Sequence, residues 1–316
     1  LKSDLDENLK NEWFILVYLL PISLFENFEF LNEKTKKNDL NIKRFVLSNI
    51  RKNEDECFFI TNNIDKHKSK LEIFQYGVGL YFQQQHIFAT EFEYEIASKY
   101  YSWTSLNDKK SIQIPLFRNF KKSNKPISQI LLINSSWGYF YKFTNGPMFE
   151  GVKKNFDNQI KFLNLVKTKF NKLIIKDAKY TDENFDKIKI YKENDLLKYK
   201  SNKNLDILLK DSFPVCSYLG TAFIELMAND IPHILFFRPS EFNATPEAKY
   251  YLKKLKKFNF IYYNPKSAAK FLIDNHNKID DLWNIKEFMI LRKEFRQKFC
   301  NSPYNWQSKF VRGLNL

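Results

Sequence analysis

One short stretch combines residue types that suit an anion at the edge of a parallel sheet. Residues 217 to 237 read SYLGTAFIELMANDIPHILFF. A predicted strand ends near Ser217, and a predicted helix begins after Gly220 with free backbone N–H groups. These groups and the helix dipole favour a phosphate, and Gly220 lets it approach the backbone closely. Thr221 adds a hydroxyl, and Glu225, one turn further on, is placed to accept hydrogen bonds from ribose hydroxyls.

The spacing around Gly220 also fits an ordinary helix start, with Glu225 as a solvated or cap-associated residue. The stretch matches neither a Walker motif nor a dinucleotide fingerprint. Spacing alone therefore does not decide between a phosphate site and an ordinary helix start.

A second candidate follows an apolar strand in FQYGVGLYFQQQHIF. Gly77 and Gly79 allow a sharp turn and a close approach to a ligand, although a single G-x-G is weak evidence. His86, beyond the turn, has the chemistry of an acid or a base, but an isolated histidine is more often structural.

Three glutamates alternate in EFEYE, at Glu91, Glu93 and Glu95. In a strand they would share one face. That arrangement is costly unless the carboxylates are solvated or matched by a cation. The pattern predicts either an exposed sheet edge or a carboxylate general base at the mouth of a cleft.

Polar residues also end two strands of the second half, in LLINSSWGYFY and LIIKDAKY. We expect Ser135, Ser136, Lys176 and Lys179 at the same sheet edge as Gly220. Lysine there suits a diphosphate or a carboxylated sugar, although lysine is the commonest residue type in this chain.

Strands and helices alternate in both halves of the chain, which predicts an α/β fold with parallel sheets and helices outside. The basic stretch FRNFKKSNKPIS is the best linker. We therefore predict two doubly wound, Rossmann-like domains, residues 1–125 and 126–284, with closing helices over 285–316. The chain begins with Leu1, so a first domain truncated upstream stays an open alternative.

A length of 316 residues with 44% hydrophobic residues favours two buried cores. The net charge of +15 comes mostly from lysine and favours anionic partners such as nucleotides, acidic glycans or anionic lipids. Most of these lysines are expected simply to solvate the surface. Nucleic acid is not the expected partner, because the aromatics lack RNP-like spacing.

The sequence indicates a reducing compartment and no metal. Cys57, Cys216 and Cys300 are widely separated and lack CxxC spacing, so neither a disulfide framework nor a zinc site is indicated. The most apolar stretch, WFILVYLLPISLF, is too short to cross a bilayer. No secretory signal precedes it, so we expect a cytoplasmic protein.

Together these stretches resemble a family of bacterial surface-carbohydrate transferases, of the capsule and O-antigen type, with the GT-B architecture. The family pattern has three elements: Q-H-G-x-x-Y-G, a glutamate before I-S-D-x-Y-x-x-W-G, and G-T-x-x-x-E followed by I-P-x-I-x-F. The matches span roughly residues 70 to 240 and are most specific in the third element. The matching residues are Gln75, Gly77, Tyr81, Glu95, Tyr100, Trp103, Gly220, Thr221, Glu225 and Pro232.

The chain departs from this pattern in its first half. Tyr76 stands in place of the histidine, Ser98 in place of the aspartate and Thr104 in place of the last glycine. If that histidine binds the acceptor or catalyses transfer, this protein uses another residue, differs in substrate or is inactive.

What the resemblance implies is a glycosyltransferase whose two domains face a cleft, with C-terminal helices crossing back to the first domain. An acceptor hydroxyl would attack the anomeric carbon of a CMP- or UDP-linked sugar, without a metal or another cofactor. The candidates for taking the hydroxyl proton are Glu95, Glu93 and His86. The candidates for donor binding are Gly77, Gly79, Tyr81, Ser136, Lys176, Ser217, Gly220, Thr221 and Glu225.

The expected partners are a nucleotide-activated sugar and an anionic glycan or glycolipid acceptor. The expected location is the cytoplasm, with peripheral association at the inner face of the cytoplasmic membrane. Two alternatives stay open: transfer of a polyol phosphate from a CDP-linked donor, and a noncatalytic, degenerate transferase domain.

Overall fold

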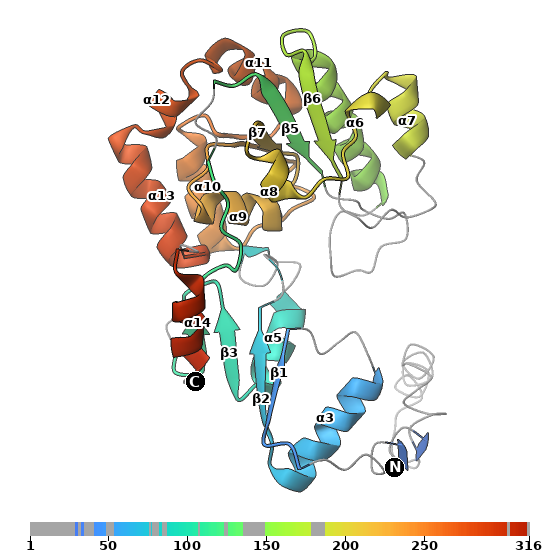
Figure 1. Cartoon of the computed structure of the whole chain (residues 1–316), viewed down its shortest axis with the longest axis vertical. Helices are drawn as coiled ribbons and strands as arrows, with labels where there is room; N and C mark the ends of the chain where they lie inside the picture. The colour runs from blue at the N-terminus through green and yellow to red at the C-terminus, as the bar shows by residue number, and fades with distance from the viewer. Residues whose placement is uncertain are drawn as a thin grey trace, which may run out of the picture. The chain divides into compact units, whose positions relative to one another are not determined.

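The fold was taken from a computed structural model (Figure 1). It describes residues 29–30, 33–34, 41–48, 54–75, 77, 82–83, 87–106, 108–122, 126–134, 149–177, 187–301 and 304–314. The chain divides into two compact units. Unit 1 comprises Leu1–Phe74 with Ile96–Lys99, and unit 2 comprises Gln75–Glu95 with Tyr100–Leu316. The domain boundaries after residues 125 and 284 stay predictions.

Unit 1 contains two of the predicted strands and the helix between them. Strand β1 (Arg44–Leu47) pairs in parallel with β2 (Lys70–Phe74), and α3 (Glu54–His67) connects them. The helix packs through Phe59, whose ring meets Phe45 of β1 edge-on at 6.0 Å. A parallel pair needs such a crossover, as the alternation of the sequence predicted.

The larger sheet of unit 2 is entirely parallel. Its strands are β5 (Gln129–Ile133), β6 (Lys172–Lys176), β7 (Phe213–Cys216), β8 (Ile234–Phe236) and β9 (Ile261–Tyr262), in the order β6-β5-β7-β8-β9. The chain therefore moves outward from β5 to β6 and then returns to the other side of β5. The strand order reverses between β5 and β7, and in open parallel sheets ligands bind at the carboxyl ends of the strands beside such a point.

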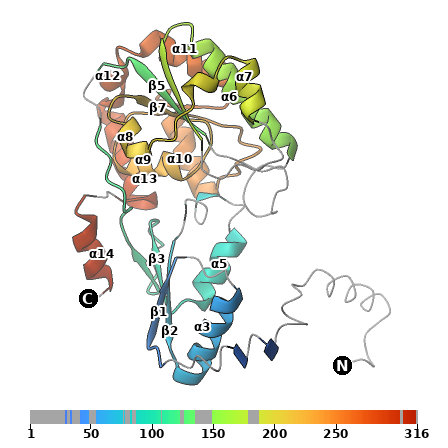
Figure 2. The ribbon, with the colours of Figure 1, turned by 45° about the vertical axis from the view of Figure 1, so that its right-hand side comes forward.

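Helices surround this sheet (Figures 1 and 2). Helix α11 (Pro265–Asn275) packs against α6 (Phe149–Val166) and contacts β8 and β9, and both views show α9 (Thr221–Ala228) and α10 (Pro246–Lys256) next to each other. The remaining segments with helical turns are α5 (Ile87–Ile96), α7 (Lys187–Glu193), η4 (Leu197–Tyr199), α8 (Leu205–Leu208), α12 (Ile279–Trp283), α13 (Lys286–Phe299) and α14 (Trp306–Leu314). The predicted α/β class with parallel sheets is confirmed.

A further parallel pair consists of β3 (Lys99–Ser102), which belongs to unit 2 from Tyr100 on, and β4 (Ser111–Gln113), with Tyr100 opposite Ser111. The C-terminal helices α13 and α14 contact this part of unit 2. The side chain of Gln113 donates to the carbonyl of Gln297 at 2.9 Å. The ring of Phe117 lies 5.1 Å from that of Trp306 in α14.

The strand predicted for EFEYE is wrong, because this segment forms α5. On a helix Glu91 and Glu95 lie one turn apart, whereas Glu93 points to another side. Glu93 is buried while the other two are exposed. The alternation misled the prediction, since alanine and glutamate favour a helix and Phe88, Phe92 and Ile96 recur every four residues.

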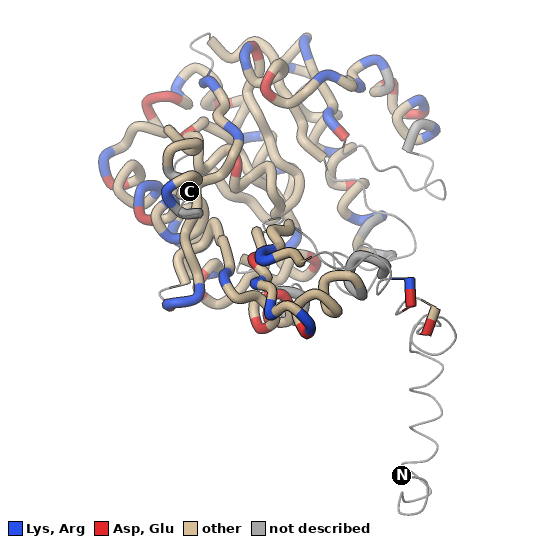
Figure 3. The backbone as a smooth tube through the Cα atoms, turned by 60° about the horizontal axis from the view of Figure 1, so that its bottom comes forward, with Lys and Arg blue, Asp and Glu red and all other residues tan. Residues whose placement is uncertain are grey.

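Basic positions recur along both units and alternate with acidic ones (Figure 3). This distribution agrees with lysines that mainly solvate the surface. None of the helices in the described part of the chain is long and apolar enough to span a bilayer.

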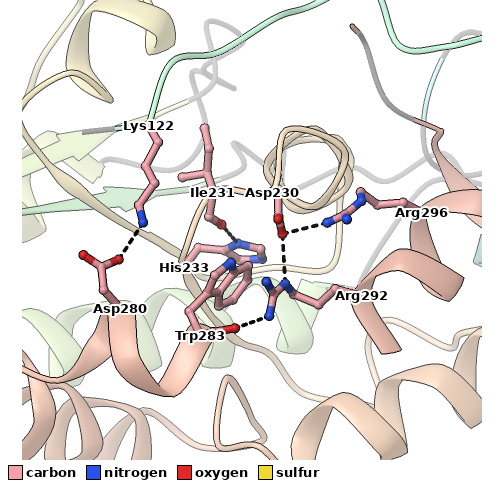
Figure 4. Close-up of polar contacts among 8 residues, drawn as sticks. All are labelled: Lys122, Asp230, Ile231, His233, Asp280, Trp283, Arg292 and Arg296. Carbon is pink, nitrogen blue, oxygen red and sulfur yellow. Dashed lines mark hydrogen bonds and ion pairs between the residues drawn. The ribbon is translucent and has the colours of Figure 1, made fainter. Parts of the chain in front are cut away.

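A buried arginine of α13, Arg292, is hydrogen-bonded to Asp230 at the end of α9 (Figure 4). The guanidinium of Arg292, 1% exposed, donates from Nε to the carboxylate of Asp230 at 2.9 Å and from an Nη to the carbonyl of Trp283. It also lies 4.2 Å from the Trp283 ring centroid. Arg296 approaches the same carboxylate at 2.6 Å.

This arrangement requires Asp230 to be ionised. Burial would raise its pKa, but the hydrogen bonds and charges of Arg292 and Arg296 outweigh burial and hold the pKa below its usual value. The ionised carboxylate therefore stabilises the fold at neutral pH, and this stabilisation is lost as the pH falls through the lowered pKa.

We predict that Asp230→Asn lowers the free energy of unfolding by about 2 to 3 kcal/mol at neutral pH, because it leaves a buried cation without its carboxylate. Asparagine keeps the side-chain shape and tolerates the left-handed backbone at this residue, where φ is 53°. Urea unfolding checks the prediction, with Asp281→Asn on the exposed side of α12 as the control. Equal stability of the two variants would contradict it.

Candidate functional site

The turn between β7 and α9 lies at the carboxyl end of the sheet beside the strand-order reversal. Gly220 is extended, with φ −149° and ψ −167°, and precedes the first residue of α9. A Cβ atom at Gly220 would lie 2.0 Å from Cε2 of Tyr218. Glycine is therefore required because the Tyr218 ring lies directly against this backbone.

The Tyr218 phenol reaches the first turn of α9. Burial raises the pKa of this phenol, and a hydrogen bond from the backbone N–H of Ala222 acts in the opposite direction. One of the N–H groups that we assigned to an anion thus has a protein partner. A phosphate at this helix end would share the site with the Tyr218 hydroxyl or displace it.

The segment around Gly77 lies against this turn. A Cβ atom at Gly77 would be 3.9 Å from the hydroxyl oxygen of Thr221. The carbonyl of Gly77 accepts a hydrogen bond from the Gln75 side chain at 2.8 Å, and the Gln83 side chain donates to the carbonyl of Leu219. Two residues predicted from separate motifs, Gly77 and Thr221, are therefore neighbours.

Aromatic packing holds Phe82, next to Gln83, against α9 and α13. Phe82 is buried, and its ring centroid lies 6.2 Å from Phe223 of α9 and 5.0 Å from Phe299 of α13. Its carbonyl accepts a hydrogen bond from the backbone N–H of Thr245 at 3.0 Å. Such aromatic contacts each contribute about 0.5 to 1.5 kcal/mol beyond the area they bury. Phe82 is thus anchored to α9, the helix that carries Thr221, and to α13.

Two matched motif residues of the first half support the segment around Gly77. The side-chain oxygen of Gln75 accepts hydrogen bonds from the backbone N–H of Trp103 at 2.7 Å and from the hydroxyl of Ser102 at 2.9 Å. Gln75 and Trp103 are both buried. They therefore position the Gly77 segment from within the core.

Glu225 is buried one turn after Thr221, beside an arginine of the predicted linker. Its carboxylate lies 3.4 Å from an Nη of Arg118. Burial raises the pKa of Glu225 to about 7, and the charge of Arg118 only partly opposes this shift. Near neutral pH the carboxyl therefore exists in both protonation states.

Asn229, one further turn along α9, fixes the linker backbone. Its amide donates to the carbonyl of Arg118 at 3.1 Å and accepts from the backbone N–H of Phe120 at 2.8 Å. Sequence reasoning missed Arg118 and Asn229. The available signal was the spacing of Thr221, Glu225 and Asn229, which places all three on one helical face.

A buried polar cluster joins the ends of three strands below the turn. The hydroxyl of Ser217 donates toward the side-chain oxygen of Asn134 at 2.7 Å and the carbonyl of Ile133 at 3.2 Å. Asn134 in turn donates to Asp177 at 3.3 Å, and the Tyr191 hydroxyl donates to the same carboxylate at 3.1 Å. The fully buried Ser217 thus holds the turn in place.

The other predicted residues lie as follows. Lys176 is the last residue of β6, and its carbonyl accepts from the backbone N–H of Asn134 at 2.9 Å. Glu93 and Glu95 lie on α5. The structure thus brings Gly77, Ser217, Gly220, Thr221 and Glu225 together, whereas the catalytic base stays a prediction. His86, Gly79, Tyr81, Ser135, Ser136 and Lys179 lie outside the described residues.

Within the described ranges, no three His, Cys, Asp or Glu side chains gather as a metal site would require. Cys216 and Cys300 are free and buried, and burial raises the pKa of both thiols. Neither thiol has the lowered pKa of a reactive cysteine.

We predict that Glu225→Gln stabilises the protein at alkaline pH. Because the pKa of Glu225 rises from 4.5 to about 7 on folding, the folded state disfavours the charged carboxylate. Above pH 7 the variant should exceed the wild type in free energy of unfolding by up to about 3 kcal/mol. Below pH 4.5 the carboxyl is protonated in both folded and unfolded chains, so the difference should vanish.

Urea unfolding across this pH range tests the prediction, with Glu287→Gln at an exposed position of α13 as the control. A Glu225→Gln variant that is less stable than the wild type at alkaline pH would show instead that the pair with Arg118 outweighs the cost of burial.

Solved structures with similar folds come from enzymes of larger size. One is a TarM variant from S. aureus in complex with fondaparinux, alpha-GlcNAc-glycerol and UDP, at 12% identity and a TM-score of 0.49, with 90% of this chain and 58% of TarM covered. Another is the pneumococcal O-GlcNAc transferase GtfA in complex with UDP and GlcNAc, at 10% identity and a TM-score of 0.49, with 90% of this chain and 59% of GtfA covered.

A third is the wall teichoic acid polymerase TagF with CDPG, at 13% identity and a TM-score of 0.46, with 86% of this chain and 71% of TagF covered. The chain thus spans less than two thirds of TarM and of GtfA. A search of curated proteins finds no match. The family described as LIC12162 family transferase matches residues 2–314, nearly the whole chain, and the protein therefore belongs to this family of transferases.

Proposed function

We propose that the protein is a GT-B-type glycosyltransferase that moves a sugar from a CMP- or UDP-linked donor to a surface polysaccharide or glycolipid, without a metal ion. The observation that carries this proposal is the meeting of Gly77 with Thr221 at the start of α9. The meeting point is the turn that follows β7, beside the strand-order reversal. Membership of a transferase family supports the class of reaction.

The donor nucleotide would lie across the carboxyl ends of β5 and β7. Backbone N–H groups of α9 and the Thr221 hydroxyl would receive a phosphate. Glu225 suits a ribose, because hydroxyls both donate and accept hydrogen bonds, and a carboxyl with a pKa of about 7 is available in both forms.

In the reaction, an acceptor hydroxyl attacks the anomeric carbon, a new C–O bond forms, and the bond from that carbon to the phosphate oxygen breaks. The hydroxyl proton passes to a base, for which Glu95, Glu93 and His86 are the proposed candidates. The developing negative charge on the phosphate is stabilised by the N–H groups of α9, with Lys176 proposed as an additional positive charge. Transfer of a polyol phosphate instead would leave phosphate on the acceptor, which product analysis detects.

We predict that Thr221→Val combined with Glu225→Ala weakens binding of the preferred nucleotide by about 10- to 100-fold, the loss of one or two hydrogen bonds. Isothermal titration with CMP, CDP, UDP and GDP measures the effect. The matched control is Thr168→Val with Glu287→Ala, two exposed positions of the same residue types. Unchanged affinity in the first double variant would refute the donor site.

We further propose peripheral association with an anionic membrane. Helix α13 exposes Met289 and Ile290, 47% and 52% accessible, next to the exposed Lys286 and Lys293. Ile290 also shares a shallow surface hollow with Lys254 of α10 and with Lys257, which caps that helix, although Glu287 and Glu294 border it as well. Apolar side chains surrounded by lysines complement an anionic lipid surface.

We predict that Met289→Ser with Ile290→Ser reduces co-sedimentation with vesicles of phosphatidylcholine and phosphatidylserine by severalfold, because the apolar contact is lost. Vesicles of phosphatidylcholine alone should bind neither protein. Leu165→Ser, at an exposed leucine of α6, serves as the control. Equal sedimentation of wild type and double variant would exclude this face.

A further inference from the structure

A cavity of about 390 Å³ lies beside the linker segment that carries Arg118. Three of its lining residues, Arg118, Asn119 and Phe120, precede the second sheet in sequence. The other three belong to the start of α8. The complete lining is Arg118, Asn119, Phe120, Asn204, Leu205 and Asp206. Nothing in the predicted donor site uses this space.

Arg118 connects this cavity to the candidate donor site. One of its Nη atoms lies 3.4 Å from the Glu225 carboxylate, while the side chain is 64% exposed. A contact of 3.4 Å is longer than the 2.7 to 2.9 Å of a charge-assisted hydrogen bond. The guanidinium has five N–H donors in a planar fork, so most of them stay available to a ligand.

The position of Arg118 is fixed from behind. Asn229 holds the backbone on both sides of Asn119, through the carbonyl of Arg118 and the N–H of Phe120. Asn229 itself caps α9 and donates to the Glu225 carbonyl at 2.8 Å. Arg118 is therefore presented by a backbone tied to the helix that carries Thr221 and Glu225.

The lining combines three kinds of hydrogen-bonding group. A guanidinium recognises a carboxylate or a phosphate through two parallel hydrogen bonds. The amides of Asn119 and Asn204 both donate and accept, and the Asp206 carboxylate accepts, which suits the hydroxyls of a sugar. The set as a whole matches a sugar ring with one anionic substituent, whereas a purely anionic ligand would meet repulsion from Asp206.

We propose that this cavity is a subsite for an acidic sugar unit of the acceptor, with Arg118 binding its carboxylate or phosphate. The proposal deepens the proposed function and rests on it, because it places the acceptor beside Glu225 and the donor. A volume of about 390 Å³ lies within the range of small-molecule sites, about 300 to 1,000 Å³.

The test is binding of three monosaccharide probes, measured by saturation-transfer NMR on the full chain. Glucuronic acid and glucose 6-phosphate carry the two anionic groups, and glucose is the neutral comparison. We expect at least one acidic probe to bind about tenfold or more tightly than glucose, as a charge-assisted bidentate contact implies. The two acidic probes distinguish a carboxylate from a phosphate.

Arg118→Ala should reduce binding of the acidic probe to the level of glucose, and Arg118→Lys should restore it only in part. Asn204→Ala should weaken all three probes alike. The matched control is Lys121→Ala, which removes an exposed cation from the same segment and should change nothing.

Three outcomes would overturn the subsite: no probe binding by the wild type, equal binding of acidic and neutral probes, or an equal loss in the Arg118→Ala and Lys121→Ala variants. Titration of the wild type with CMP, CDP and UDP separates the two proposals. Nucleotide binding without acidic-sugar binding refutes the subsite alone, whereas absence of nucleotide binding refutes the donor site.

Discussion

The position of α9 depends on a cation that is buried at its end. Arg292 has lost nearly all contact with water, so its charge is stable only beside Asp230 and the carbonyl of Trp283. Asp230 directly follows the cap of α9, and its left-handed backbone ends the helix there. Moving α9 along its axis would separate the two charges in a low-dielectric interior. The helix start at Thr221 is therefore held at the sheet edge from its far end.

With α9 fixed, its partly accessible face organises segments from distant parts of the sequence. Thr221 meets Gly77, Glu225 meets Arg118, and Asn229 holds the linker backbone at Phe120. These three helix residues follow each other at intervals of four, so they form one line. Gly77, which follows β2, and the linker thus lie along the same line of side chains. If α9 binds a nucleotide at its start, as we propose, that binding would be in a position to influence the linker at the end of the helix.

The sequence predicts the parts of this arrangement that depend on local pattern. Strands β5, β7 and β8 are short apolar runs buried on both faces, and the glycine before Thr221 marks a helix start. The local pattern did not predict α5, because the alternating glutamates of EFEYE favour a strand whereas the helix propensity of the same residues favours a helix. It also did not reveal the steric reason for a glycine at position 220, since the clash with Tyr218 appears only when the ring is folded back.

The sequence could not predict the contacts of Arg118 and Asn229, because they arise from tertiary packing between distant segments. The hydrogen bond between Phe120 and Asn229, for example, joins residues about 110 positions apart. The same holds for the burial of Ser217, which a hydroxyl at a strand end does not reveal. Local spacing indicates which residues share a face but not what covers that face. Residues adjoining a ligand site are therefore harder to predict than the residues of its central turn.

Glu225 shows why the contact between the linker and α9 matters for chemistry. A carboxyl with a pKa of about 7 changes charge in the range where enzymes work, and burial is the main cause of the shift. When it is ionised, the positive charge of Arg118 attracts it, and the linker is held more strongly against α9. When it is protonated, that attraction is lost and the guanidinium is freer to bind another anion. The protonation state of Glu225 thereby determines how strongly Arg118 is attracted to α9. The charge at the proposed ribose position is thus coupled to the availability of Arg118 for a ligand.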